Sequence, residues 1–571
     1  MRNTETGLTL WADAVCINQD DLGERYQQVQ LMGDVYSSAE EVLVWLGYGE
    51  KAQAPRQQPK VYYWTGTATD MGLVNAYFEE VKLLGEKNIG TEDILGAFVL
   101  LSLLAADRHL HEMDFFEIET GRLQALKTWQ SVTHELKKLY SVSWWTRIWV
   151  FQEVVLARRV VVLYNYMTAP WDMLERAVAC SDSHIRSCCL KLFETRPEEE
   201  RVIVVGLAWR LHACVEGRKT FRNQNGRLSL FQAVNLTLGR DATDVRDKLY
   251  GLVGLISNGY EEALLLPNYS LSPKEVFIWA SLIELEEVNS LRGLMGTTRK
   301  DVPDVPSWVT QIFVSETYRG LEETRCFHAE LFRAAGLTRA SVEREGDILT
   351  VHALKPADRI ASVGMIMGED NLKSWGGLFH VLKTWRKMAS LVYGEVYSHG
   401  GTQSWSDAFW RTVVNDYIQM ETLDGLAKYS TNANSRTFRT FRDTDLPHLP
   451  ENWWSWDTDL MIGTDAVLSF QEPLMAATCL RKFFITIGGR MGLGSPSILP
   501  GDEILLLLGG NTPFATRNCT NDINNPKTLI GDVYVHGLMY GEGLPEDWEE
   551  KVVKIRLQQF VFIIVFFFRN S

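Results

Sequence analysis

The stretch LTLWADAVCINQDDLGERYQQVQLMGDVYSSAEEVLVWLG, residues 8–47, decides the fold class of the N-terminal region. Residues 8–16 form a nearly uncharged apolar run, which predicts a strand buried on both faces. Asp21 with Glu24 three residues later indicates a helix start, and residues 42–46 predict a second buried strand. A strand, a helix and a strand at this spacing favour a parallel crossover. We therefore expect an α/β domain at the N-terminus.

A dense set of positions in this stretch matches a known sequence signature. The matching positions are Trp11, Asp13, Cys16, Ile17, Asn18, Gln19, Glu24, Arg25, Gln28, Val29, Met32, Tyr36, Ala39, Val42, Trp45, Leu46 and Gly47. Together they resemble the signature of the fungal heterokaryon incompatibility (HET) domain. The resemblance implies a role in nonself recognition and in programmed cell death after incompatible hyphae have fused.

A second motif lies at residues 141–165, SVSWWTRIWVFQEVVLARRVVVLYN. Its run from 145 to 153 resembles the aromatic-Thr-Arg-x-Trp-x-x-Gln-Glu motif of the HET family, and residues 160–164 predict the strand that follows. Trp149 and Glu153 are four residues apart, so on a helix their side chains share one face. A tryptophan beside a carboxyl group partly desolvates it, which raises its pKa, and also offers a stacking surface for a flat ligand.

The order of these elements also resembles a TIR domain, which has a strand, a variable loop, a helix, a strand and then a Trp-x-x-x-Glu helix. In enzymatic TIR domains that glutamate is catalytic, because its charge stabilises the oxocarbenium-like state as the nicotinamide–ribose bond of NAD breaks. The resemblance implies Glu153 as the catalytic residue and Trp149, Arg147 and Asp13 as ligand-binding residues, with NAD as substrate and no resident cofactor. The alternative is an ion pair of Glu153 with Arg147 or Arg158, with Trp149 in the core.

HET domains usually carry an earlier strand with a Leu-Ser-Tyr-x-Trp-Gly-like motif, and residues 1–6 contain nothing similar. The resemblance therefore implies an N-terminally truncated or degenerate family member, with a TIR-like parallel sheet whose first strand is missing. Because a sheet that lacks a strand exposes unpaired backbone groups, we expect this sheet to be completed differently.

A third motif, RDATDVRDKLYGLVGL, lies at residues 240–255. It resembles the Arg-Asp-Lys-x-Tyr-Gly-Leu-x-Gly-Leu landmark of the HET family, and the Pro-Asn-Tyr-Ser loop at residues 267–270 follows it as in that family. The alternating charges predict a salt-bridged helix start that packs on its neighbour. We favour a structural role for this motif over a catalytic one.

The sequence gives little support for a metal site. His109 and His111 alternate, and Asp114 follows closely, which is a pattern found in zinc hydrolases. No further ligand cluster completes it, so a solvated helix end is the favoured interpretation and no metal is predicted. The eight cysteines form no CxxC pair, which is typical of reduced thiols in a cytoplasmic protein.

The periodicity of the apolar residues divides the chain further. We expect a HET domain over residues 1–180 with a helical insertion at 50–125, a helical region over 200–320, and a mixed, β-rich C-terminal module over 335–545. Together these regions predict an α/β N-terminal domain, a helical middle region and a β-rich C-terminal module.

The net charge and the C-terminal tail indicate which classes of binding partner the protein has. A net charge of −15 argues against a nucleic-acid partner. The tail, residues 546–571, contains an apolar run at 560–568 that is too short for a membrane span and is typical of a self-associating strand. We expect a cytoplasmic protein whose partners are other incompatibility proteins or further copies of itself. It would act either as an NAD hydrolase or as a non-enzymatic adaptor that signals by assembly.

Overall fold

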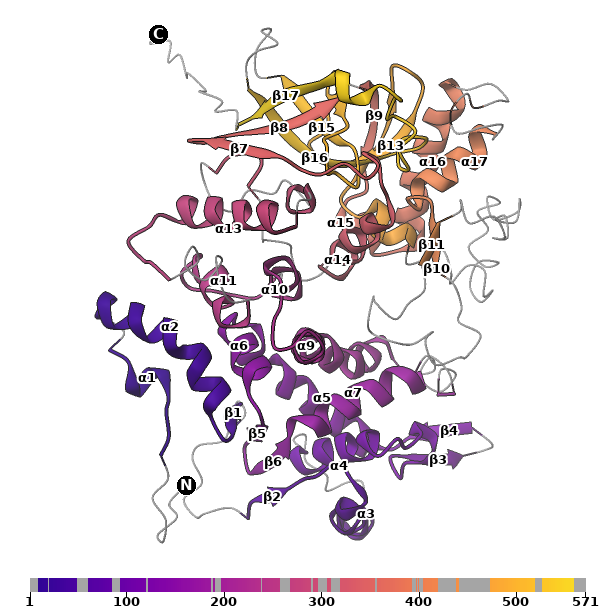
Figure 1. Cartoon of the computed structure of the whole chain (residues 1–571). Coiled ribbons are helices and arrows are strands. Elements are labelled where there is room, and N and C mark those ends of the chain that lie inside the picture. The colour runs from indigo at the N-terminus through magenta and orange to yellow at the C-terminus, as the bar shows by residue number, and fades with distance from the viewer. Residues whose placement is uncertain are drawn as a thin grey trace, which may run out of the picture. The chain divides into compact units, whose positions relative to one another are not determined.

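The chain folds into two compact units, of which the first ends at Leu271 and the second begins at Ser272. The computed structural model describes residues 9–18, 20–48, 60–84, 93–119, 122–185, 188–189, 197–237, 239–256, 267–288, 291–295, 305–309, 319–354, 357–392, 397, 399, 404–419, 438–440, 473–518 and 526–558. Figure 1 shows the elements of both units.

The first unit combines helices with a four-stranded sheet. Its described α-helices are α1 (Asp13–Cys16), α2 (Leu22–Ser38), α3 (Met71–Leu84), α4 (Ile94–Ala105), α5 (Lys127–Ser141), α6 (Trp149–Leu156), α7 (Trp171–Ile185), α9 (Glu198–Asn223), α10 (Leu230–Thr237) and α11 (Asp247–Tyr250). Short 3₁₀ helices are η1 (Ala68–Asp70), η3 (Leu110–Glu112), η4 (Ser143–Thr146) and η5 (Val253–Leu255). The strands are β1 (Val42–Trp45), β2 (Tyr62–Tyr63), β3 (Phe116–Glu119), β4 (Arg122–Ala125), β5 (Val160–Tyr164) and β6 (Met167–Pro170).

The predicted helix start at Asp21 is confirmed. The Asp21 carboxylate accepts hydrogen bonds from the backbone N–H groups of Gly23 at 2.8 Å and Glu24 at 3.1 Å. This N-cap satisfies donors that have no partner inside the helix, so α2 begins at the next residue. The strand predicted after this helix is also confirmed, as β1.

The strand predicted at residues 8–16 is wrong over the residues that the structure describes. Residues 9–12 pair with no strand, and α1 follows them. The Asp13 carboxylate accepts the N–H of Ala14 at 2.8 Å, a local bond that competes with sheet pairing. Leu10 and Val15 remain 60% and 85% exposed, so the run gains little from burial as a strand would.

The sheet is completed by a strand from much later in the chain. Its order is β1-β5-β6-β2, with β1 parallel to β5 in the register Val42↔Val160. The pair β2–β6 is also parallel, whereas β5 and β6 form an antiparallel hairpin. The N-terminal unit is thus α/β with parallel strand pairs, as predicted, and β5 supplies the parallel partner expected from residues 8–16.

Helices α4, α5, α7 and α9 pack against one another beside this sheet. Helix α4 is buried along nearly its whole length, from Gly96 to Ala105, because its sequence is apolar on every face. The insertion expected at residues 50–125 contains α3 and α4, and it also contains the antiparallel hairpin β3–β4.

Two glycines bring α2 into close contact with η5. A Cβ added to Gly254 would lie 3.0 Å from the Cα of Gly33 and 2.9 Å from Oε1 of Gln152. The same Gln152 oxygen accepts the backbone N–H of Gly254 at 3.1 Å. Glycine at both positions therefore allows the first and third motifs to pack at backbone distance, with the second motif hydrogen-bonded to the third.

Replacing Gly254 by valine is expected to lower the free energy of unfolding of the first unit by about 1–3 kcal/mol, since the new side chain overpacks this contact. Urea unfolding followed by tryptophan fluorescence measures the effect. Gly72→Ala in α3 is the control, because a Cβ there would meet nothing within 4 Å. Equal unfolding midpoints for the two variants would contradict the close-packing argument.

The second unit is β-rich, as predicted. Its described helices are α13 (Pro273–Val288), η6 (Leu291–Leu294), α14 (Arg319–His328), η7 (Ala329–Leu331), α15 (Glu369–Leu372), α16 (Trp375–Val392), α17 (Trp405–Val413) and η11 (Trp548–Lys551). Its strands are β7 (Val342–Glu345), β8 (Ile348–Leu354), β9 (Asp358–Ile366), β10 (Tyr417–Gln419), β11 (Phe438–Thr440), β12 (Lys482–Thr486), β13 (Met491–Gly494), β14 (Glu503–Leu505), β15 (Phe514–Asn518), β16 (Lys527–Val535) and β17 (Val552–Leu557).

Six of these strands close into an antiparallel barrel. They follow the order β13-β12-β9-β14-β15-β16, and β13 pairs back with β16. Phe484, Ile504 and Val533 are fully buried in its core. Strands β17, β8 and β7 extend the sheet beyond β16. Closure leaves few unpaired edges, which suits a strand-rich module.

Helices in the described part of the chain are all too short or too polar to cross a lipid bilayer. The apolar run predicted to self-associate, residues 560–568, lies outside the described residues.

Candidate active site in the first unit

Glu153 lies in the second turn of α6. Hydrogen bonds to the residues just before this helix fix its position. Trp145 in η4 is fully buried and donates its indole N–H to the carbonyl oxygen of Leu139 at 2.8 Å. Arg240, also buried, donates to the carbonyl oxygens of Trp145 at 3.0 Å and Arg147 at 3.1 Å. The first residue of the third motif thus fixes the backbone of the second motif beside Glu153.

The surroundings of Glu153 raise its pKa to about 7. Burial is the largest cause, because it disfavours the charged form. The positive charge of Arg147 opposes this effect, the negative charge of Asp13 adds to it, and a hydrogen bond from Trp144 opposes it again. A carboxyl group with a pKa near neutrality can both accept and release a proton at physiological pH.

Three of the four residues predicted for the site come together here. Asp13 of α1 and Arg147 lie close enough to Glu153 to change its pKa. The fourth, Trp149, donates a hydrogen bond to Asp247 instead. The indole that hydrogen-bonds to Glu153 belongs to Trp144, which the sequence analysis missed.

Tyr36 of α2 is a further residue of this site. Burial raises the pKa of its hydroxyl well above its usual range, and the negative charges of Glu153 and Asp13 add to the effect. Its ring also packs edge-on against Trp11, with centroids 5.8 Å apart. Both aromatic residues belong to the first motif, so that motif contributes Tyr36 to the site and supports it with Trp11. Both residues are matching positions of the HET signature, and this was the one sequence feature that could have pointed to them as site residues.

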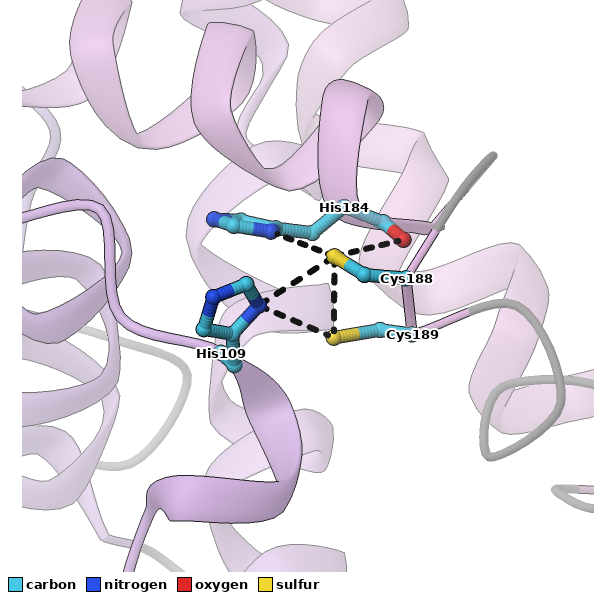
Figure 2. Close-up of side chains that lie close together, drawn as sticks. All are labelled: His109, His184, Cys188 and Cys189. Atoms are coloured by element: carbon cyan, nitrogen blue, oxygen red, sulfur yellow. Dashed lines mark hydrogen bonds between the residues drawn. The ribbon is translucent and has the colours of Figure 1, made fainter.

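The residues considered as metal ligands, His109, His111 and Asp114, do not form one site. Asp114 is exposed and pairs with Lys82 at 3.5 Å. His109, in contrast, lies beside His184, Cys188 and Cys189 (Figure 2).

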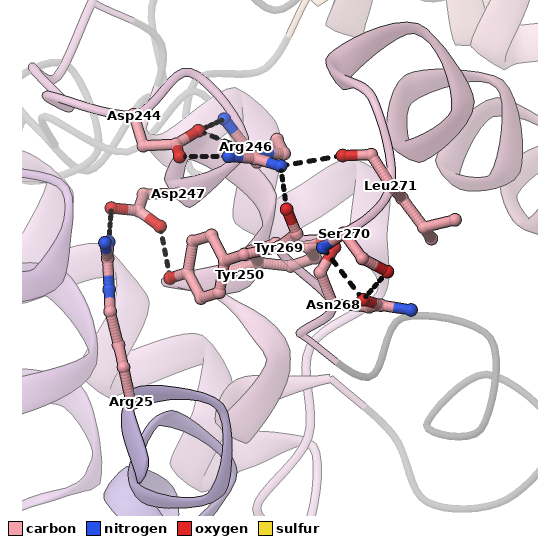
Figure 3. Close-up of polar contacts among 9 residues, drawn as sticks. All are labelled: Arg25, Asp244, Arg246, Asp247, Tyr250, Asn268, Tyr269, Ser270 and Leu271. Carbon is pink, nitrogen blue, oxygen red and sulfur yellow. Dashed lines mark hydrogen bonds and ion pairs between the residues drawn. The ribbon is translucent and has the colours of Figure 1, made fainter. Parts of the chain in front are cut away.

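Asp247 at the start of α11 joins all three motifs (Figure 3). Its carboxylate lies 3.3 Å from Nη2 of Arg25 in the first motif, and it accepts a hydrogen bond from Trp149 in the second. The hydroxyl of Tyr269 donates to it at 2.6 Å, and the Arg25 guanidinium lies 4.2 Å from the centre of the Tyr269 ring. Burial raises the pKa of Asp247 despite these partners.

Arg246 clamps the loop that carries Tyr269. Its guanidinium binds both oxygens of Asp244, at 2.9 and 2.6 Å. It also donates to the carbonyl oxygens of Tyr269 and Leu271, each at 2.7 Å. The third motif therefore forms the salt-bridged helix start that its charge pattern predicts, and it positions the loop around Asp247.

The site combines a carboxyl group whose pKa lies near 7, an arginine and several aromatic rings. Arg147 can neutralise an anionic ligand, and the indoles and Tyr36 offer apolar surface for a flat ring. Glu153 can stabilise a positive charge that develops on a bound substrate.

Comparison with known proteins agrees with the motifs. The family description "Heterokaryon incompatibility protein (HET)" matches residues 1–153, which end at Glu153. A similar protein is "Heterokaryon incompatibility protein 6, OR allele" of Neurospora crassa, 24% identical over 588 aligned positions that cover 94% of this chain and 81% of the relative. No solved structure matches the chain. Residues 1–153 therefore match the HET family, and nearly the whole chain is similar to a fungal heterokaryon incompatibility protein.

Proposed function

We propose that this protein acts in fungal nonself recognition and in the programmed cell death that follows the fusion of incompatible hyphae. The observation that carries the proposal is the likeness to an incompatibility protein over 94% of the chain, which includes both units. The acidic net charge supports protein partners over nucleic acid. The partners would be other incompatibility proteins or further copies of the chain in the cytoplasm.

Overexpression in a filamentous fungus tests this proposal. Growth arrest and cell death are expected, and they should scale with the amount of full-length protein. Healthy colonies that contain the protein at high level would contradict it.

A second candidate function is TIR-like hydrolysis of NAD through Glu153. It is supported by the pKa of about 7 that burial gives this carboxyl group, next to Arg147 and Asp13. In the reaction the nicotinamide–ribose bond breaks and its electron pair leaves with nicotinamide. Water then attacks the ribose carbon, and ADP-ribose, nicotinamide and a proton are released. The ionised Glu153 would stabilise the positive ribose, while Arg147 binds phosphate and an indole stacks on a base.

Glu153→Ala is expected to reduce nicotinamide release from NAD by about 10²–10³-fold, because it removes the charge that stabilises the transition state. Chromatography of purified protein incubated with NAD measures the release. Glu117→Ala, at an exposed position of β3, is the matched control and should leave the rate unchanged.

Expressing the same pair of variants in cells distinguishes the enzymatic function from the adaptor function. If Glu153→Ala kills cells as efficiently as the unmodified chain, and the pure protein releases no nicotinamide at high concentration, the enzymatic candidate is wrong. Cell death would then arise through assembly alone.

A further inference from the structure

Two histidines and two cysteines converge in the first unit, outside the site around Glu153. His109 immediately precedes η3, His184 lies in the last turn of α7, and Cys188 and Cys189 follow that helix (Figure 2). One nitrogen or sulfur atom from each of the four lies within 4.8 Å of the others. Because α4 and α7 pack together, the turn after α4 and the end of α7 meet at this point.

The distances in the cluster fit a tetrahedral metal site. Nδ1 of His184 lies 3.0 Å from Sγ of Cys188, and Nδ1 of His109 lies 3.2 Å from the same sulfur. Sγ of Cys189 lies 3.9 Å from both Sγ of Cys188 and Nδ1 of His109. Zinc bonds of about 2.1 Å to nitrogen and 2.3 Å to sulfur give tetrahedron edges of about 3.3–3.8 Å. The separations of 3.0–3.9 Å bracket these edges, and since the widest of the six is at most 4.8 Å, shifts of up to about 1 Å would seat the ion.

The surroundings orient the first histidine ligand. Nε2 of His184 lies 2.9 Å from a carboxylate oxygen of Asp107, so its other nitrogen, Nδ1, faces the sulfurs. A carboxylate on the distal nitrogen of a histidine is the common outer partner of zinc-binding histidines, where it fixes the ring and its tautomer. His184 and Cys189 are buried, whereas Cys188 is exposed and offers a route of entry.

We infer that His109, His184, Cys188 and Cys189 bind one zinc ion as a structural Cys₂His₂ site. Four protein ligands leave no open position for water or substrate, which distinguishes a structural zinc site from a catalytic one. Binding replaces the two thiol protons, which are released to solvent. The ion ties the turn after α4 to the end of α7 and so stabilises the helices that pack beside the sheet.

No spacing of ligand residues along the chain predicts this site. The cysteine pair follows His109 by about 80 residues, and adjacent cysteines match no familiar zinc motif. His111 is the neighbour that could be mistaken for a ligand, because its Nδ1 lies 4.0 Å from Sγ of Cys189. Its exchange for alanine should leave the ion in place, whereas His109→Ala should release it.

Metal analysis of the full chain, expressed with added zinc, is expected to find about one zinc ion per molecule. After the metal is stripped under reducing conditions, titration with Co²⁺ should give thiolate-to-cobalt charge-transfer bands and the strong visible bands of tetrahedral cobalt. The double variant Cys188→Ser/Cys189→Ser should lose these bands. Cys16→Ser, at an exposed cysteine outside the cluster, is the matched control and should keep them.

Asp107→Asn tests the site without removing a ligand, and it should weaken metal affinity by about 10–100-fold. Far-UV circular dichroism verifies that each variant is folded. Folded, reduced wild-type protein that shows no thiolate–cobalt band would overturn the inference. So would bands that persist in the double cysteine variant. A disulfide between Cys188 and Cys189 that resists reduction in the purified protein would also overturn it.

Discussion

Replacing Asp532 by alanine is expected to lower the free energy of unfolding of the second unit by about 3–5 kcal/mol. Asp532 lies on β16 of the barrel, where one carboxylate oxygen pairs with Arg325 of α14 and, at 3.4 Å, with Arg481. All three side chains are almost completely buried. Without the carboxylate, two positive charges would remain in the interior without this counter-charge, which is far more unfavourable than losing a surface pair.

Arg481 makes the effect extend beyond the ion pair. Its guanidinium also donates to the carbonyl oxygens of Leu493 on β13, at 2.8 Å, and of Asp532 itself, at 3.0 Å. Strands β13 and β16 are the pair that closes the barrel. A displaced Arg481 would therefore loosen the closure as well as the charge cluster.

Urea unfolding of the full chain measures this prediction. Asp547→Ala is the matched control, since Asp547 pairs with Lys551 at 2.7 Å and both side chains are about half exposed. Exposed pairs contribute little to stability, so the control should unfold at the wild-type midpoint. Equal unfolding midpoints for the two alanine variants would show that the Asp532 carboxylate does not stabilise the second unit, and would contradict the prediction.

Local signals in the sequence were sufficient for most single elements. The start of α2 at Asp21 follows from capping chemistry, and β5 occupies the residues that its β-branched run predicts. Their pairing was not predictable in the same way. Strand β1 pairs with β5 across more than a hundred residues of chain, and no local pattern records that choice. The run at residues 8–16 was apolar enough for a strand, but it has no buried place in the sheet.

In the candidate site, too, neighbours along the chain could be predicted from the sequence, whereas side-chain partners could not. The second motif was sufficient to predict that Glu153 and Arg147 lie close together, because they are only six positions apart in the chain. It did not identify which indole binds the carboxylate, since that depends on where η4 ends and α6 begins. The helical spacing of four favoured Trp149 as the neighbour of Glu153, and the indole that hydrogen-bonds to Glu153 is that of Trp144 in η4. Sequence spacing alone does not fix the direction of a side chain at a helix start.

Glu153→Gln is expected to make the first unit more stable than the wild type above pH 7, and equally stable below about pH 4.5. The pKa of Glu153 is about 7 in the folded chain against an ordinary 4.5. Between these values the unfolded chain loses a proton that the folded chain retains, so wild-type stability falls as the pH rises, and it levels off above 7. The shift corresponds to about 3 kcal/mol. Glutamine keeps the size and the acceptor for Trp144 but does not ionise.

Unfolding midpoints in urea, measured from about pH 4 to pH 9, test this expectation, with Glu117→Gln at an exposed position as the control. Curves for Glu153→Gln and wild type that run parallel would contradict the raised pKa. The same titration separates a structural carboxyl group from a catalytic one. If the ionised form stabilises a positive ribose, nicotinamide release should rise with pH through about 7, the pH at which the fall in stability ends. A stability change without a matching change in rate would leave Glu153 as a buried carboxyl group with no part in NAD cleavage.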